Sequence, residues 1–511
     1  MVMRSRKWCV AIAACIWLFS AGARGADKPE DPLAILRESV SYRRLGNGIS
    51  VIVVNRGYSP TLALITSFHV GSADESYRTI GTAHLLEHML FKGTDKVGTK
   101  NYAMEKPLLD QIELIGDSLD KIRMENPNDK RIPGLANQLK KLQADASAYV
   151  VSSPYDKAYT SNGGVGFNAS TSRDMTSYYI ELPSAKLELW AQMESERLRN
   201  PVMREFYLER NAVMEERLMR YDSKGTAGLM ERFIAAAFVA HPYRHPIIGW
   251  PSNIKFLSVF DVKDFYKTNY IPSRMTITIA GKQNPEETFA LVEKYFGKLE
   301  GKDNGGDIPV KEPARRGEAR VDYVFDANPF LFIGWAKPTF HSPDDAVCDL
   351  IAGLLADGKT SRLYRSLVID KKLASSVDAW ADFPGARYDN IFVIAAEPRH
   401  PHTAQELESA IYEEIELMKT EITDEEIARV ISREEASFIF DLASNKGVAN
   451  TLNYYQTVYG DWQYALRYLE AIRTVTPARV KEVLAKYFVK ENRTVGTLVN
   501  ASAKKSRDAG K

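Results

Sequence analysis

Cysteine is the scarcest residue in this sequence, with 3 of 511 positions. Two of the three, Cys9 and Cys15, stand within the first 25 residues, which leaves Cys348 for the rest of the chain. A single cysteine cannot form an internal disulfide, so the hydrophobic core must hold the fold together. Cys348 lies in the apolar stretch DAVCDLIAGLL, which favours a buried, inert thiol over a nucleophile.

An excess of charge of one sign is also missing, since 67 Lys and Arg residues face 66 Asp and Glu residues. The chain therefore has no basic footprint for nucleic acid. With 45% hydrophobic and 26% charged residues, it is neither a disordered polar chain nor a polytopic membrane protein. Histidine occurs only 8 times, so any chemistry built on it can be traced residue by residue.

Residues 1–25 have the pattern of a secretory signal peptide. Basic residues precede an apolar run over 8–19, which is too short for a confident membrane span, and Ala23-Arg24-Gly25 fits a cleavage site before Ala26. Cleavage would change the net charge from +1 to −3. We expect an exported protein, periplasmic or secreted, with no transmembrane span in the mature chain. A lipoprotein signal ending at Cys15 is the alternative.

Two long halves can be followed after this leader. In the first half, strands over 42–45 and 49–54 flank Gly46-Asn47-Gly48, a hairpin turn signal. This half closes with a helix over 259–270 and a buried strand over 273–281. The second half closes in the same way, with a helix to Tyr487 and the strand TVGTLV, and this repeated order suggests an internal duplication. The predicted units are the leader 1–25, a first half 26–300, a Gly-, Pro- and charge-rich linker 301–320 and a second half 321–511.

One segment of the first half does not fit the duplication. Apolar residues recur in steps of four and three over 108–122 and again over 135–149, and Asn126-Pro127-Asn128 separates the two runs. This pattern predicts an inserted, projecting helical hairpin over 102–150 with a coiled-coil-like seam. Two ordinary amphipathic helices of the main fold are the alternative.

The strongest chemical signal is GTAHLLEHMLFKGT, which contains His84, Glu87 and His88. On a helix, positions i, i+3 and i+4 share a face, so both imidazoles can bind one ion while Glu87 stands beside it. Two imidazoles and an open position suit Zn²⁺, and a carboxylate next to the metal is a natural base for water. The order is H-x-x-E-H, the reverse of the more common H-E-x-x-H. The surrounding residues are mostly apolar, which argues against a solvated surface helix.

A third protein ligand has to come from elsewhere in the chain. His241 and His245 have helical spacing, but the prolines of HPYRHP favour a loop. The segment LERNAVMEERLMR offers Glu209, Glu215 and Glu216 on a predicted helix, and the first and last of these are two turns apart on one face. The pattern does not choose between Glu215 and Glu216.

Four segments together resemble the pitrilysin or insulinase family of zinc peptidases, in that family's order. They are HLLEHMLFKGT, GGVGFNASTSRDMTSYYIELP, FYLERNAVMEERLMR and HPYRHPIIGW. The resemblance is specific over 69–250 and extends more weakly over about 40–500. It implies an α+β fold of clamshell type, with two homologous halves that each combine a mostly antiparallel sheet with helices.

The resemblance also implies roles for single residues. His84, His88 and Glu216 would bind one Zn²⁺ per chain, Glu87 would be the general base, and Glu209 would be a supporting carboxylate of the catalytic site. The distance from His88 to Glu216, 128 residues, exceeds the usual spacing of these motifs. The inserted hairpin accounts for the excess and leaves the ligand assignment intact.

Substrate and partner expectations follow from the same resemblance. Asn168 and Ala169 would lie on an edge strand that pairs with the substrate backbone. The second half has no histidine motif and resembles the inactive half of such enzymes. The family also uses an arginine and a tyrosine of an inactive half, but no motif places them here, and Arg387 and Tyr388 stay outside the predicted site.

We therefore expect a zinc-dependent endopeptidase that acts on peptides or unfolded polypeptides. Since the chain is half a clamshell, it would work as a homodimer or as a heterodimer with a related chain that lacks the zinc motif. A non-catalytic peptide-binding or structural subunit is the main alternative, and a metal-dependent hydrolase of another substrate class is a weaker one. The complete set of His84, Glu87, His88 and Glu216 favours the enzyme.

Overall fold

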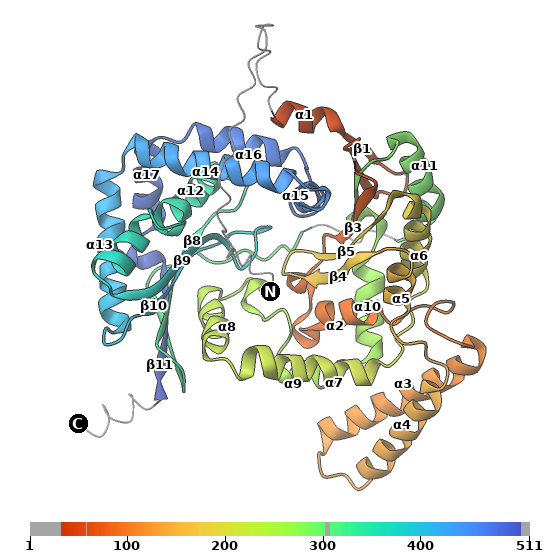
Figure 1. Ribbon diagram of the computed structural model, residues 1–511. Helices are drawn as coiled ribbons and strands as arrows, with labels where there is room; N and C mark the ends of the chain where they lie inside the picture. The colour runs from red at the N-terminus through yellow and green to blue at the C-terminus, as the bar shows by residue number, and fades with distance from the viewer. Residues whose placement is uncertain (1–31, 58, 302–306, 502–511) are drawn as a thin grey trace, which may run out of the picture.

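The computed structural model describes residues 32–57, 59–301 and 307–501, and the predicted signal peptide lies outside them. Within these ranges the chain forms two βα halves, with the first half on the right and the second on the left of Figure 1. No helix in the described ranges combines the length and the apolar character needed to cross a bilayer.

The first half is built on a six-stranded sheet. Its strands, in spatial order, are β1 (Val40–Arg44), β2 (Ser50–Asn55), β6 (Met275–Gly281), β3 (Thr61–Phe68), β5 (Thr176–Pro183) and β4 (Val165–Thr171). Strands β2 and β6 are parallel and all other pairs are antiparallel. The predicted turn before β2 is present, with Gly48 at φ +98°.

The second half repeats this topology in a five-stranded sheet. Its strands, in spatial order, are β7 (Ala319–Phe325), β11 (Arg493–Asn500), β8 (Phe330–Lys337), β10 (Asn390–Pro398) and β9 (Ala374–Phe383). Without the extra edge strand β1, each sheet has five strands. When these are counted by their order along the chain, both sheets place them side by side as first, fifth, second, fourth and third. In both sheets the first and fifth are the parallel pair. The two homologous halves expected from the sequence are therefore present, and β7 includes the last two residues of the predicted linker, 319 and 320.

Helices cover both sheets. Those of the first half are α1 (Pro32–Ser39), α2 (Thr82–Met89), α3 (Tyr102–Glu125), α4 (Ile132–Ser147), α5 (Pro154–Thr160), α6 (Leu187–Arg199), α7 (Phe206–Arg217), α8 (Gly225–Ala237), α9 (Pro251–Ile254), α10 (Val259–Asn269) and α11 (Pro285–Phe296). Those of the second half are α12 (Asp344–Ala356), α13 (Ala404–Glu421), α14 (Asp424–Leu442), α15 (Asn445–Tyr459), α16 (Tyr464–Arg473) and α17 (Pro477–Tyr487). Cys348 is buried in α12, where burial raises the pKa of its thiol, as expected for an inert cysteine.

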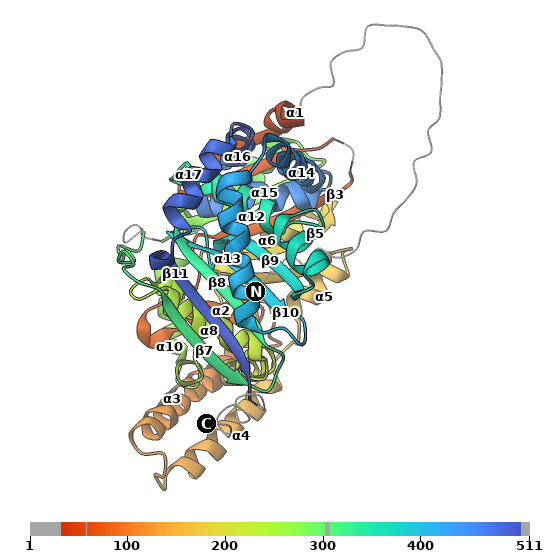
Figure 2. The ribbon, with the colours of Figure 1, turned by 90° about the vertical axis from the view of Figure 1, so that its left-hand side faces the viewer.

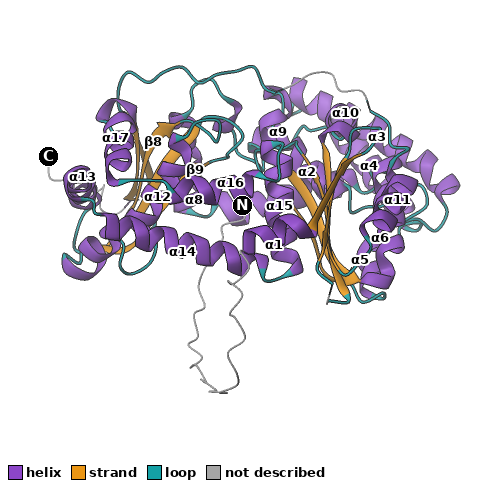
Figure 3. Cartoon of the chain, turned by 90° about the horizontal axis from the view of Figure 1, so that it is seen from above, coloured by secondary structure: helices purple, strands orange, loops and turns teal. Residues whose placement is uncertain are grey.

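In each half, one helix packs on the sheet of the other half. Helix α15 packs on the face of the first sheet that carries Ile52 and Ile65, and α8 packs on the second sheet, where Phe233 stacks on Phe332 at 5.5 Å. Figure 3 shows these helices between the two sheets. Burying apolar side chains across this exchange ties the two halves into one folded unit.

Helices α3 and α4 form the expected antiparallel hairpin, which extends away from both sheets at the bottom of Figures 1 and 2. Asn101 caps α3 by accepting the backbone N–H of Met104. Pro107 stands in the second turn of α3, where it lacks the N–H that would otherwise bond the carbonyl oxygen of Ala103.

Candidate metal centre

The start of helix α2 (Thr82–Met89), which carries the H-x-x-E-H residues, is fixed by a glycine and a glutamate. Gly81 precedes it with φ +99°, and a Cβ there would lie 2.8 Å from the carbonyl oxygen of Ile248, so only glycine fits. The carboxylate of Glu75 accepts the backbone N–H groups of Gly81 and Ala83 at 2.9 and 2.7 Å. An acidic group at a helix start satisfies its free N–H groups and favours its dipole.

Three potential ligand atoms converge beside this helix. His84 Nε2 lies 3.7 Å and His88 Nε2 3.6 Å from the same oxygen, Oε2 of Glu216 on α7. The two imidazole rings are 4.8 Å apart, and all three side chains are half-buried. The neighbouring Glu215 is exposed, so of the two glutamates that the sequence left open, Glu216 is the one that faces the histidines.

This donor set fits Zn²⁺. Ligand bonds of about 2.0–2.1 Å in a tetrahedral site place the donor atoms roughly 3.3 Å apart, close to the spacing found here. Two imidazoles and one carboxylate leave a fourth position open, as in catalytic zinc sites. Burial and the neighbouring His88 lower the pKa of His84 to about 3, so its imidazole is neutral, as a ligand must be. Its Nδ1 is buried without a partner among the described residues.

Glu87 stands next to these ligands and is held from the edge strand. The hydroxyl of Thr171, the last residue of β4, donates to Oε2 of Glu87 at 2.5 Å. Burial raises the pKa of Glu87, and the hydrogen bond from Thr171 and the charge of His88 oppose the rise. A carboxylate with a raised pKa is suited to taking up and returning a proton near neutral pH.

A second layer of charges surrounds the ligands. The Nδ1–H of His88 donates to Oε2 of Glu209 at 3.4 Å, and Lys92 lies 2.5 Å from the other oxygen of Glu209. Burial would lower the pKa of His88, but the hydrogen bond to Glu209 and the charges of Glu87, Glu216 and Glu209 together outweigh it and raise that pKa. Burial would raise the pKa of Glu209, but His88 and Lys92 outweigh it and lower that pKa. Arg220 lies 2.8 Å from Glu216 and forms an ion pair with the carboxylate of this third candidate ligand.

Thr171, Lys92 and Arg220 were not predicted. Arg220 carries a short-range signal, because it follows Glu216 by four residues, about one helical turn, whereas Lys92 lies just beyond the end of α2. Thr171 follows Ala169 by two residues, and residues two apart on a strand point to the same face. Which charges these side chains meet depends on the packing of distant segments.

The two residues expected to bind substrate lie on an edge strand. Asn168 and Ala169 belong to β4, which among the described strands pairs only with β5 and so forms the edge of the first sheet. The side chain of Asn168 is exposed, whereas Ala169 is buried. The edge is open to a further strand, although the backbone N–H of Ala169 donates to the side-chain oxygen of Asn168 at 2.8 Å.

The remaining candidates lie elsewhere. His241 and His245 flank a 3₁₀ turn, the loop that the prolines favoured, and Nδ1 of His241 accepts the backbone N–H of Tyr243. Arg387 is buried at the junction of the halves, where it binds Asp74 at 3.2 Å. Within the described ranges, these contacts explain Arg387 without a substrate.

A second group of ligand-type residues lies in the second half. Asp345, Asp349 and Asp382 approach one another within 4.8 Å. Lys337 binds Asp345 and lies 3.1 Å from Asp382, so the protein supplies its own cation here. Burial raises the pKa of Asp345 to about 6 and also raises that of Asp349, which reduces the negative charge. This group therefore has the character of an ion-pair network, in which Asp345 is buried and Asp382 is exposed.

Comparisons with known proteins agree with the sequence motifs. The family model described as insulinase, peptidase family M16, matches residues 50–117 and 123–250, and the model described as peptidase M16 inactive domain matches 257–434. A zinc protease, PqqE, of Helicobacter pylori is 31% identical over 325 residues, 62% of this chain and 72% of that protein. The probable mitochondrial-processing peptidase subunit beta of Arabidopsis thaliana is 22% identical over 87% of this chain and 75% of its own length.

Solved structures show the same architecture. A protease from Helicobacter pylori superposes with a TM-score of 0.75 and 26% identity, covering 90% of this chain and 99% of that one. The periplasmic protease PqqL of Escherichia coli superposes with a TM-score of 0.67 and 16% identity. That match covers 93% of this chain but 48% of the PqqL chain, so the present chain is similar to half of PqqL.

Proposed function

Because the chain belongs to the insulinase family of peptidases, M16, we propose that it is a zinc-dependent endopeptidase acting on peptides or unfolded polypeptides. The observation that carries the proposal is the convergence of His84, His88 and Glu216, with Glu87 on the same helix face. A subunit that only bound peptides would not need this complete set. The relatives named as zinc proteases support the metal.

Each residue has a separate task in the proposed reaction. His84, His88 and Glu216 hold the zinc ion, which when bound polarises the scissile carbonyl and makes water more acidic. Glu87 takes a proton from the attacking water and delivers it to the leaving amine. The hydroxyl of Thr171 orients Glu87 for both transfers, and Glu209 holds His88 so that its Nε2 points to the ion.

The edge strand supplies the substrate site. A peptide added beside β4 would pair its backbone with that of Asn168 and Ala169, which selects an extended chain more than a particular side chain. Because β4 ends at Thr171, a peptide paired with this strand would reach Glu87. Unfolded substrates are preferred because a folded protein offers few free strand backbones.

The domain assignment extends this proposal to the whole chain. Residues 26–300 form the catalytic half, 301–320 the linker and 321–511 a non-catalytic half, which the match to the inactive-domain family supports. A second chain, identical or lacking the zinc motif, would complete the clamshell. The subunit naming of the mitochondrial relative and the greater length of PqqL are compatible with this. Export through residues 1–25 is part of the proposal.

The test uses the purified full-length protein. Its zinc content is measured, and hydrolysis of an unstructured peptide is followed with and without a chelator and after zinc is restored. We expect about one zinc per chain, cleavage that the chelator abolishes and recovery on adding zinc. Cleavage that persists without metal contradicts the mechanism. Stoichiometric zinc without cleavage favours a binding subunit or a missing partner chain.

A further inference from the structure

Two opposite faces of helix α7 make contacts, one with the metal centre and one with the inserted hairpin. Glu209 and Glu216 are two turns apart and face the histidines of α2. Tyr207 stands about two and a half turns before Glu216, which places it on the opposite side of α7. That opposite side packs against α3, the first helix of the inserted hairpin, through three contacts that join the two elements.

The first contact is a buried ion pair at the start of α7. Arg204 binds both oxygens of Glu105 on α3, at 2.5 and 2.8 Å, and the two side chains are 1% and 0% exposed. Arg204 also donates to the backbone carbonyls of Lys92 and Thr94, at 2.6 and 3.1 Å. Because these carbonyls belong to the segment after α2, one guanidinium connects the hairpin to both helices of the metal centre.

The second contact is a close approach of ring and backbone. A Cβ at Gly116 of α3 would lie 2.0 Å from the ring of Tyr207, so the ring occupies the space that any other residue would need. The Tyr207 hydroxyl donates to Asp117 at 3.1 Å. Glycine is unfavourable inside a helix, which makes its presence here a packing requirement of this contact.

The third contact is another buried ion pair, one turn further along α7. Arg210 donates to Asp120 of α3 at 2.5 Å and to the carbonyl oxygen of Leu257 at 2.8 Å. Both charged side chains are buried, with 8% and 9% of their surface exposed. A buried pair whose partners come from two elements fixes their separation and register, because a shifted charge would be left without a partner.

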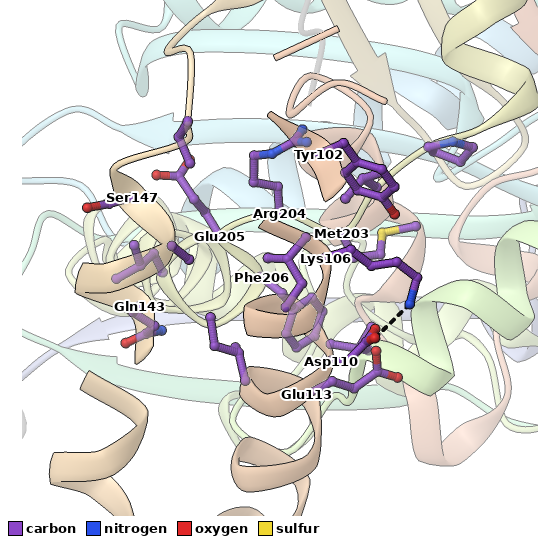
Figure 4. Close-up of a pocket in the computed structure, with 18 of the residues that line it drawn as sticks. Tyr102, Lys106, Asp110, Glu113, Gln143, Ser147, Met203, Arg204, Glu205 and Phe206 are labelled. Carbon is purple, nitrogen blue, oxygen red and sulfur yellow. Dashed lines mark hydrogen bonds and ion pairs between the residues drawn. The ribbon is translucent and has the colours of Figure 1, made fainter. Parts of the chain in front are cut away.

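A cavity of about 120 Å³ lies at the base of the hairpin, between α3 and the segment that enters α7 (Figure 4). The cavity interrupts the packing locally, while Ile112 of α3 belongs to the same buried apolar cluster as Phe206 and Tyr207 of α7. The three contacts described above add fixed polar and close-packed links between α3 and α7.

We propose that the inserted hairpin is a positioning element of the metal centre, in which Glu105, Gly116 and Asp120 of α3 set the position of α7 and thereby of Glu216. The inference rests on the proposed zinc site and extends it to a segment with no ligand of its own. Residues behind metal ligands commonly change metal affinity by about 10- to 100-fold when they are altered.

Zinc affinity of the full-length protein, measured by competition with a chromophoric chelator well below the unfolding temperature, tests the proposal. We expect Gly116→Ala and Asp120→Asn to weaken zinc binding by about 10-fold or more. Two matched controls lie on α4: a Cβ at Gly134 meets nothing within 4 Å, and Asp145 is exposed. Gly134→Ala and Asp145→Asn should keep the affinity within about twofold of wild type.

Unchanged affinity in the two α3 variants, with folding verified by circular dichroism, would overturn the proposal. A purely structural role would lower the unfolding temperature and leave the zinc affinity unaltered. If Gly116→Ala does not fold, Tyr207→Phe replaces it, since it keeps the ring and removes only the hydroxyl, which donates to Asp117 and to the carbonyl oxygen of Glu113. A wild-type protein that binds no zinc would instead refute the proposed function, which separates the two failures.

Discussion

Lys92 and Glu209 form an ion pair of 2.5 Å that holds the Glu209 carboxylate against His88. Glu209 accepts the Nδ1–H of His88, which leaves Nε2 of that ring to face Glu216. The pair therefore determines which ring nitrogen is available to a metal, although neither residue is a ligand.

Replacing Lys92 with Met should weaken zinc binding by about 10-fold, because Glu209 loses the cation that keeps it in place. The measurement is the zinc dissociation constant, together with kcat for peptide hydrolysis. Lys96→Met is the matched control, since Lys96 is exposed and pairs with Glu196. Equal zinc affinities for the two variants would show that Lys92 does not position His88.

Glu216→Gln should lose most of the bound zinc, whereas Glu215→Gln should retain it and keep its activity. An amide oxygen binds zinc less well than a carboxylate, and only Glu216 faces the two histidines. Zinc content after dialysis, with activity as a second readout, distinguishes the variants. The assignment of the third ligand fails if both variants behave alike.

Sequence reasoning reached the parts of this site that depend on local geometry. His84, Glu87 and His88 share a helix face by spacing alone, and their apolar neighbours showed that the helix is buried. Glu216 could not be separated from Glu215 in this way, because the choice depends on where α2 lies relative to α7. The contact of Thr171 with Glu87 likewise depends on how β4 packs beside α2.

In the fold, as in the site, local features could be predicted from the sequence and contacts between distant segments could not. The repeated helix and strand at the ends of the two halves gave the duplication, and the steps of three and four gave the hairpin. The exchange of α8 and α15 between the sheets could not be foreseen, because an apolar helix face does not reveal which of two apolar sheets it will cover. The buried pairs of Arg204 and Arg210 are hidden for a similar reason, since a charged residue in a sequence is more often solvated.

Glu87→Gln should lower kcat by about 10²- to 10⁴-fold and leave zinc bound, because the amide cannot take up a proton. Thr171→Val should have a smaller effect, since Glu87 keeps its charge and loses only the hydroxyl that orients it. The comparison requires kcat, KM and zinc content for each variant. A fully active Glu87→Gln protein would exclude Glu87 as the general base.

Arg387→Met should destabilise the junction of the two halves by about 3 kcal/mol. Arg387 lies 3.2 Å from Asp74, and both side chains are buried, so the substitution leaves Asp74 without its cation. The free energy of unfolding in urea measures the loss. The exposed Arg399 provides the control Arg399→Met, which should change stability by less than about 0.5 kcal/mol. A similarly small change in Arg387→Met would mean that the halves do not depend on this pair.

His241 should make the protein less stable as the pH falls. Burial lowers the pKa of His241 to about 4, with Arg387 acting in the same direction and Glu312 against it. Between pH 6.5 and pH 4 the unfolded chain therefore binds a proton that the folded chain does not, and stability is lost as the pH falls through this window. The loss between pH 7 and pH 5 should be about 1 to 2 kcal/mol smaller in His241→Gln, after allowance for screening. The exposed His400 gives the control, and equal pH dependence of His400→Gln and His241→Gln in urea unfolding would contradict a buried neutral imidazole at position 241.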